Sequence, residues 1–162
     1  MENSTKSPSL KARKELKMQF IDRIILKKKL EKRFEGIKIK YTKNRFECDI
    51  EKQIVYLPKE KNPKSDFYFW TWYEKHYNTR IDETELFLLS MLHEIGHIMT
   101  WTEELEEERD EQFDLLQALY ELSNLTTRQL NNQYFEIPME LQATEWAKNY
   151  FEKNFKKPLT NN

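Results

Sequence analysis

The fold of this chain is decided by residues 81–101, IDETELFLLSMLHEIGHIMTW. Asp82 and Glu85 have the spacing of a capping box, in which two side chains accept hydrogen bonds from each other's backbone N–H groups at a helix start. We therefore predict a helix from Asp82 to about Trp101. Apolar residues lie nearly all round its axis, which is typical of a helix buried in the centre of a domain.

The size and composition of the chain limit its class. A length of 162 residues suits one hydrophobic core, and aromatic residues make up 14% of the sequence, which argues against wholesale disorder. We predict a disordered tail at residues 1–9 and a single domain over residues 10–158. Cys48 is the only cysteine, which excludes an internal disulfide framework. No apolar run approaches the roughly 20 residues of a membrane span, and residues 1–10 lack the apolar segment of a secretory signal, so we expect a cytoplasmic protein.

The segments before residue 81 predict a helix, a small sheet and an aromatic stretch. The apolar residues of 10–34 recur at helical spacing, and Gly36 ends that helix. Residues 37–42, 46–51 and 53–57 have the character of strands with short connections, which favours a three-stranded antiparallel meander. Residues 67–77 hold seven aromatic residues, and we expect them to cover the core rather than line a cleft.

The chain after residue 101 is predicted to be helical. An acidic segment at 103–110 leads into an amphipathic helix with Phe113, Leu116, Leu119 and Tyr120 on one face. Thr126 and Gln129 form a second capping box, and Pro138 suits the first position of a last helix that reaches about Asn154. The fold class is therefore α+β, with a small antiparallel sheet packed against a mostly helical body around a central helix.

The central helix contains the motif His93-Glu94-Ile95-Gly96-His97, an HExxH. Residues four apart share one helix face, so both imidazoles can bind one tetrahedral zinc ion, and Glu94 beside them can act as a general base. The alternative is that both histidines are satisfied by hydrogen bonds in the core. Burying three titratable groups without a cation costs several kcal/mol, which favours the metal site.

A catalytic zinc site needs a third protein ligand and an open position. The third histidine, His76, precedes the motif, so a downstream carboxylate is the candidate. Glu140 borders the apolar stripe of the last helix, where the small residues Ala143 and Ala147 permit a close approach to the HExxH helix. We therefore predict Glu140 as the third ligand. The alternatives are Glu136, Glu145 or a member of the acidic run at 103–108, which we otherwise interpret as a solvated helix face.

Two segments resemble the ImmA/IrrE-type metallopeptidases of phages and mobile elements. Their pattern is HExxH followed by E-x-x-A-x-x-F-A, which residues 93–97 and 140–147 match with Trp146 in place of Phe. The strand at 54–57 also resembles the one that precedes their active-site helix. The resemblance implies a zincin-like fold of the gluzincin type. It also implies one Zn²⁺ held by His93, His97 and Glu140, with Glu94 as general base, and a regulatory protein substrate such as a helix-turn-helix repressor.

Three functions remain open from the sequence. The first, favoured by the intact Glu94, is a zinc-dependent metalloendopeptidase that hydrolyses a peptide bond of a protein. The second is a catalytically silent metal-binding module, such as an anti-repressor or host-takeover factor. The third is a nucleic-acid-binding protein that uses residues 10–45 and holds a structural zinc ion.

The charge distribution bears on the third function. Residues 1–64 hold 19 Lys/Arg and 9 Asp/Glu, a net charge of +10, whereas residues 65–162 hold 8 and 19, a net charge of −11. The basic part lacks the interleaved aromatic residues of a nucleic-acid reader. We therefore expect the opposite charges to complement each other within the protein or between protomers, and nucleic acid not to be a partner.

Overall fold

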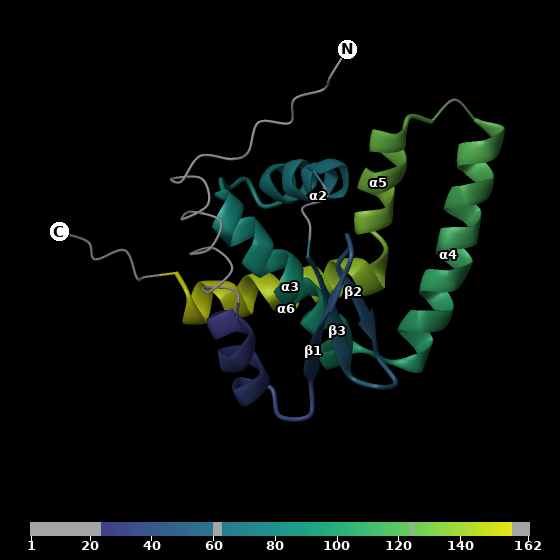
Figure 1. The fold of residues 1–162 in the computed structure, drawn as a ribbon. Helices are drawn as coiled ribbons and strands as arrows, with labels where there is room; N and C mark the ends of the chain where they lie inside the picture. The colour runs from purple at the N-terminus through teal and green to yellow at the C-terminus, as the bar shows by residue number, and fades with distance from the viewer. Residues whose placement is uncertain (1–23, 60–62, 124, 157–162) are drawn as a thin grey trace, which may run out of the picture. The chain divides into compact units, whose positions relative to one another are not determined.

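The computed structural model describes residues 24–59, 63–123 and 125–156 (Figure 1). This part of the chain is α+β, with six helices and one open, mixed sheet of three strands. The chain divides into two compact units, residues 1–39 and 40–162. The predicted tail at 1–9 and the first half of the predicted N-terminal helix lie outside the described residues, and the single domain over 10–158 stays a prediction.

In the first unit, residues 24–33 are helical, as predicted for this part of the chain. Leu30 is buried, and its carbonyl accepts a hydrogen bond from the Phe34 N–H at 2.8 Å. Gly36 then has a φ of 96°, a left-handed conformation that glycine adopts without strain and that ends the helix. The Glu31 side chain accepts a hydrogen bond from the Ile39 N–H at 2.9 Å, which fixes the chain as it leaves the helix.

The sheet contains β1 (Lys38–Thr42), β2 (Glu47–Asp49) and β3 (Ile54–Pro58) in the order β1-β3-β2. β2 and β3 pair antiparallel, with Cys48 opposite Val55. Because the sheet is mixed, β1 and β3 run parallel, and the predicted antiparallel meander is wrong. The reason lies in the composition of the strands. Ile54, Val55 and Leu57 form an apolar run that is buried on both faces, so β3 takes the central position.

The sheet is followed by α2 (Pro63–His76) and then by α3 (Glu83–Thr100). α3 forms the centre of the domain. α2 contains the aromatic stretch at 67–77, for which the sequence predicted neither a helix nor a strand. Phe69, Trp72 and Tyr73 are buried, which confirms that the stretch covers the core. α3 begins at the predicted capping box.

The last three helices are α4 (Glu103–Leu122), α5 (Thr127–Phe135) and α6 (Pro138–Asn154). The second capping box and the proline at the start of α6 are present as predicted. Of the four residues predicted to share one face of this helix, only Leu116 is buried. No helix along the described residues is long and apolar enough to cross a membrane.

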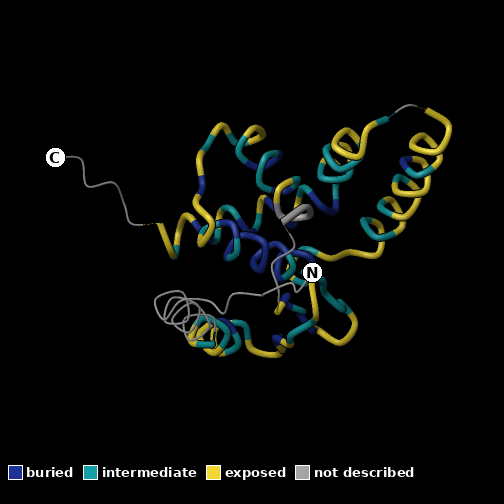
Figure 2. Tube along the Cα trace, turned by 45° about the horizontal axis from the view of Figure 1, so that its top comes forward, coloured by how far each residue is buried: buried dark blue, intermediate teal, exposed yellow. Residues whose placement is uncertain are grey.

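Buried residues concentrate in α3 and in the helix that packs on it, α6. Ten residues of α3 are buried, from Leu86 to His97. Figure 2 shows the opposite situation in α4, which is yellow and teal along most of its length. The structure therefore sets a rigid centre, which carries the HExxH motif, beside a helix that is mostly exposed to solvent.

Candidate metal centre

The HExxH motif lies in the middle of α3. Its two histidines point the same way because they are one helical turn apart, and both are buried, with 7% and 6% of their surface exposed. The Nε2 atoms of His93 and His97 are 3.1 Å apart. The structure therefore confirms that both imidazoles converge on one point.

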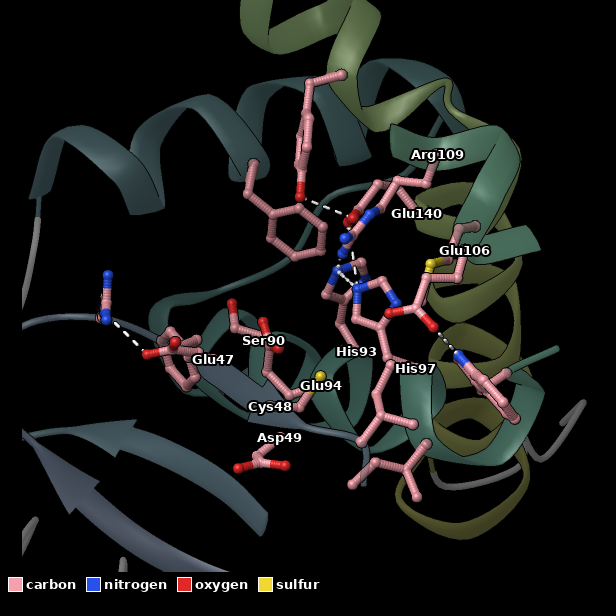
Figure 3. A pocket seen from close by; sticks show the side chains of 18 of the residues that line it. Glu47, Cys48, Asp49, Ser90, His93, Glu94, His97, Glu106, Arg109 and Glu140 are labelled. Carbon is pink, nitrogen blue, oxygen red and sulfur yellow. Dashed lines mark hydrogen bonds and ion pairs between the residues drawn. The ribbon is translucent and has the colours of Figure 1, made fainter. Parts of the chain in front are cut away.

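Glu140, in the first turn of α6, completes the group. Its Oε2 atom lies 3.1 Å from the His93 Nε2 atom and 3.2 Å from the His97 Nε2 atom, and only 2% of the residue is exposed (Figure 3). Burial alone would raise the pKa of the Glu140 carboxyl, but the hydrogen bonds from the two histidines hold it well below its usual range. Glu140 is therefore an anion next to two imidazoles.

This group of three buried side chains could hold a metal ion. In a tetrahedral site with ligands at about 2.0–2.1 Å, two ligand atoms are about 3.3 Å apart, which is close to the 3.1–3.2 Å seen between each pair here. One orphaned atom marks the same group, since His97 Nδ1 is buried without a hydrogen-bond partner among the described residues. Two imidazole nitrogens and one carboxylate oxygen are ligands that suit zinc.

Thr144, one turn after Glu140 on α6, sets the orientation of His93. Its hydroxyl donates to the Glu140 carbonyl at 2.8 Å, so its oxygen is left to accept a hydrogen bond from His93 Nδ1 at 2.9 Å. With one proton held on Nδ1, His93 can give up the Nε2 proton that it shares with Glu140 and present the Nε2 lone pair to a metal ion. Residues that orient metal-binding histidines in this way also raise the metal affinity.

Tyr134, on α5, holds the other oxygen of the Glu140 carboxylate. Its hydroxyl donates to Oε1 at 2.7 Å, which leaves Oε2 directed at the histidines. Burial and the negative charge of Glu140 raise the pKa of Tyr134 far above its ordinary value, so the hydroxyl keeps its proton. Neither Thr144 nor Tyr134 was predicted from the sequence as part of the site. The i, i+4 spacing of Glu140 and Thr144 was the available signal.

Glu94 lies beside the group and is not part of it. Loss of water around its carboxyl raises the pKa of Glu94, against the opposing charges of His93 and His97. The Cys48 thiol hydrogen-bonds the same carboxylate, and burial raises the pKa of Cys48, so the thiol stays protonated and can donate. A carboxylate with a raised pKa is suited to taking and returning a proton near neutral pH.

A cleft of about 870 Å³ opens over this group, large enough for several residues of a peptide. Its walls come from β2, α3, α4, α5 and the start of α6, and Figure 3 shows Cys48 and Glu94 on one side of the histidines and Arg109 and Glu106 on another. Phe69 also lines the cleft, and its ring centroid lies 5.6 Å from that of His93. One residue of the aromatic stretch therefore covers the core and lines the cleft at once.

The other predicted ligand candidates lie apart from the group. Glu136 accepts hydrogen bonds from Trp72 Nε1 at 2.8 Å and from His76 at 3.1 Å, and Glu145 is exposed on α6. In the acidic run, Glu106 reaches the cleft and accepts a hydrogen bond from Trp101 at 2.9 Å. The remaining members of that run are exposed, as a solvated face requires: Glu103, Glu104, Glu107 and Glu108.

Comparison with models of known protein families, with curated protein sequences and with solved structures gives no match in any of the three. The resemblance to the ImmA/IrrE-type metallopeptidases, which rests on residues 93–97 and 140–147, stays a prediction.

Proposed function

We propose that this protein is a zinc-dependent metallopeptidase with a zincin-like fold, related to the ImmA/IrrE-type enzymes. His93, His97 and Glu140 would bind one Zn²⁺, and Glu94 would act as the general base. The observation that carries the proposal is the convergence of these three ligand atoms within 3.2 Å of one another, beside a desolvated Glu94 and under an open cleft.

The number of ligands favours a catalytic site over a structural one. A closed structural zinc site uses four protein ligands, whereas a catalytic site uses three and leaves one position for water or substrate. Only three His, Cys, Asp or Glu residues meet here among the described residues. Cys48, which could have supplied a thiolate, instead hydrogen-bonds Glu94.

Each residue around the site would have a distinct role in peptide hydrolysis. A zinc ion held by His93, His97 and Glu140 would supply a Lewis acid that makes water easier to deprotonate and polarises the scissile carbonyl. Glu94 takes the proton of the attacking water and delivers it to the nitrogen of the leaving amine, so that the peptide bond breaks and two new termini form. Thr144 and Tyr134 keep His93 and Glu140 in the orientation that binds the metal.

Metal content of matched variants tests the ligand set. The purified protein should contain one zinc ion per chain by elemental analysis, and His93→Ala or Glu140→Ala should remove it. Glu145→Ala is the control, because Glu145 is exposed on the same helix as Glu140. Equal metal content in Glu140→Ala and Glu145→Ala would reject Glu140 as a ligand.

Catalysis is tested separately with Glu94→Gln, which keeps the size of the side chain and removes the base. This variant should retain zinc and its melting temperature, while cleavage of a casein or peptide-library substrate falls by at least about a hundredfold. A zinc-loaded parent protein that cleaves no member of a broad peptide library would instead support the catalytically silent metal-binding module.

A further inference from the structure

α4 exposes far more apolar surface than a helix of a monomeric domain requires. Leu116 is its only buried residue, while five large apolar or aromatic side chains are between 38% and 88% exposed. They are Phe113, Leu115, Leu119, Tyr120 and Leu122. Three of them, Leu115, Leu119 and Leu122, share one face of the helix, and exposed apolar residues gathered in this way mark a surface that binds another molecule.

Six exposed residues of α4 form one row along the helix, which we call the α4 outer row. Their spacings of four and three residues place them on one face: Glu104, Glu108, Glu111, Leu115, Leu119 and Leu122. The row extends about 27 Å, at about 1.5 Å per residue. Its first half is acidic and its second half is apolar, so its two ends would attract different side chains.

The charge of α4 is strongly one-sided. Its sequence, EELEEERDEQFDLLQALYEL, contains nine acidic residues and one arginine, and Arg109 is engaged by Asp110 through hydrogen bonds at 2.6 and 3.0 Å. The apolar end differs, because Leu115 borders a cavity of about 690 Å³ that is also lined by Lys75 and Arg128. Seven of the nine acidic residues lie in the first half of the helix, so basic groups of a partner are favoured most at the Glu104 end.

We infer that the α4 outer row binds a partner protein through an amphipathic helix that is basic in one half and apolar in the other. The basic half lies over Glu104, Glu108 and Glu111, and the apolar half packs on Leu115, Leu119 and Leu122. Complementary charge sets the direction of the helix, and apolar burial supplies most of the affinity. This inference does not depend on the metal centre or on any peptidase activity.

The α4 helix of a second copy does not fit the row in the same way. Two α4 helices packed in parallel would bring the three glutamates of one row against those of the other. Packed antiparallel, they would press the glutamates of each copy against the leucines of the other, so that carboxylates lose water without a partner. A partner with its own lysines or arginines avoids both penalties.

Binding of a designed peptide to the full chain tests the inference. The probe is a fluorescein-labelled, 18-residue synthetic helix with leucines on one face, lysines beside them in one half and glutamines in the other. A companion peptide has glutamates in place of the lysines. Fluorescence anisotropy should give micromolar binding of the lysine peptide, at least tenfold weaker binding of the glutamate peptide, and a loss of affinity between about 0.05 M and 0.3 M salt.

Matched variants locate the binding surface. The triple variant Glu104→Gln/Glu108→Gln/Glu111→Gln and the triple variant Leu115→Ser/Leu119→Ser/Leu122→Ser should each weaken binding of the lysine peptide at least tenfold. The control Glu35→Gln/Glu145→Gln/Glu152→Gln changes the net charge equally at other exposed sites and should leave the affinity within about twofold. Circular dichroism confirms that each variant is folded.

Two results would overturn the inference. One is equal weakening by the α4 glutamate variant and the control, because binding would then reflect overall charge alone. The other is a parent protein that is dimeric by light scattering and becomes monomeric on Leu115→Ser/Leu119→Ser/Leu122→Ser, which would assign the outer row to a second copy of the chain.

Discussion

Gly96 and Ala143 bring the two central helices into backbone contact. A Cβ atom placed on Gly96 would lie 2.5 Å from the Ala143 carbonyl oxygen, closer than such atoms approach in proteins. Gly96 is inside the HExxH motif, and Ala143 is one turn after Glu140. The distance between α3 and α6 at this contact therefore decides whether the Glu140 carboxylate reaches the two histidines.

Gly96→Ala should accordingly weaken metal binding and stability together. The added methyl group must push the backbone of α6 away, since the atom that it meets is a carbonyl oxygen and cannot rotate aside. Overpacking of this kind costs about 1–3 kcal/mol of unfolding free energy. Zinc affinity, measured by competition with a chelator, should fall at least tenfold. Ser90→Ala, at a buried position of the same helix, is the control. Equal zinc affinity in the two variants would show that the contact between Gly96 and Ala143 does not position Glu140.

Thr144→Val tests the orientation of His93. Valine keeps the shape of the side chain and removes the oxygen that accepts the hydrogen bond from His93 Nδ1. Loss of such a partner usually lowers metal affinity by about 10- to 100-fold. Thr144→Ser restores the hydroxyl and should recover most of that affinity. If valine and serine bind zinc equally well, packing and not the hydrogen bond explains the role of this residue.

Tyr134→Phe tests whether the hydrogen bond from the Tyr134 hydroxyl orients the Glu140 carboxylate. The substitution removes the hydroxyl that donates to Oε1 at 2.7 Å, so the carboxylate can turn and lose its alignment with the histidines. Zinc affinity should fall by roughly tenfold, a smaller loss than for Glu140→Ala, because the ligand itself remains. Tyr120→Phe, at an exposed position of α4, should change nothing. Zinc affinity that is unchanged in Tyr134→Phe would limit Tyr134 to lining the cleft.

The sequence predicted which of these side chains lie together better than it predicted the sheet. HExxH spacing fixes which side chains share a helix face, and the small residues of the last helix identified the carboxylate that could approach. The strand order depends instead on which strand can be buried on both faces. Ile54–Leu57 is the strand that can, and it therefore lies in the centre of the sheet. The alternation of apolar and polar residues and the short connections do not reveal which strand is central. The predicted meander was therefore wrong.

The burial of α4 could not be predicted from the sequence, for a similar reason. Phe113 and Leu119 have the spacing of a core-facing stripe, but a periodic pattern does not say whether the domain has a surface left to cover it. In the structure, α3 and α6 already bury each other, and α4 packs mainly through Leu116. An apolar pattern typical of a core-facing helix therefore supports an external interaction surface here.

The basic N-terminal part should not bind DNA under physiological conditions. Five basic residues lie in the helix at 24–33, namely Lys27, Lys28, Lys29, Lys32 and Arg33, and Lys27 is 3.7 Å from Glu31. The whole chain nevertheless has a net charge of −1, so it offers a polyanion no net attraction beyond about one Debye length, roughly 8 Å at physiological salt. A gel-shift titration with random duplex DNA should show no binding below about 10 µM at 0.15 M salt.

Micromolar or tighter binding would contradict this expectation if the logarithm of the binding constant falls linearly with the logarithm of the salt concentration, with a slope of several charges. Loss of that binding in Lys28→Gln/Lys29→Gln/Lys32→Gln would then assign it to this helix.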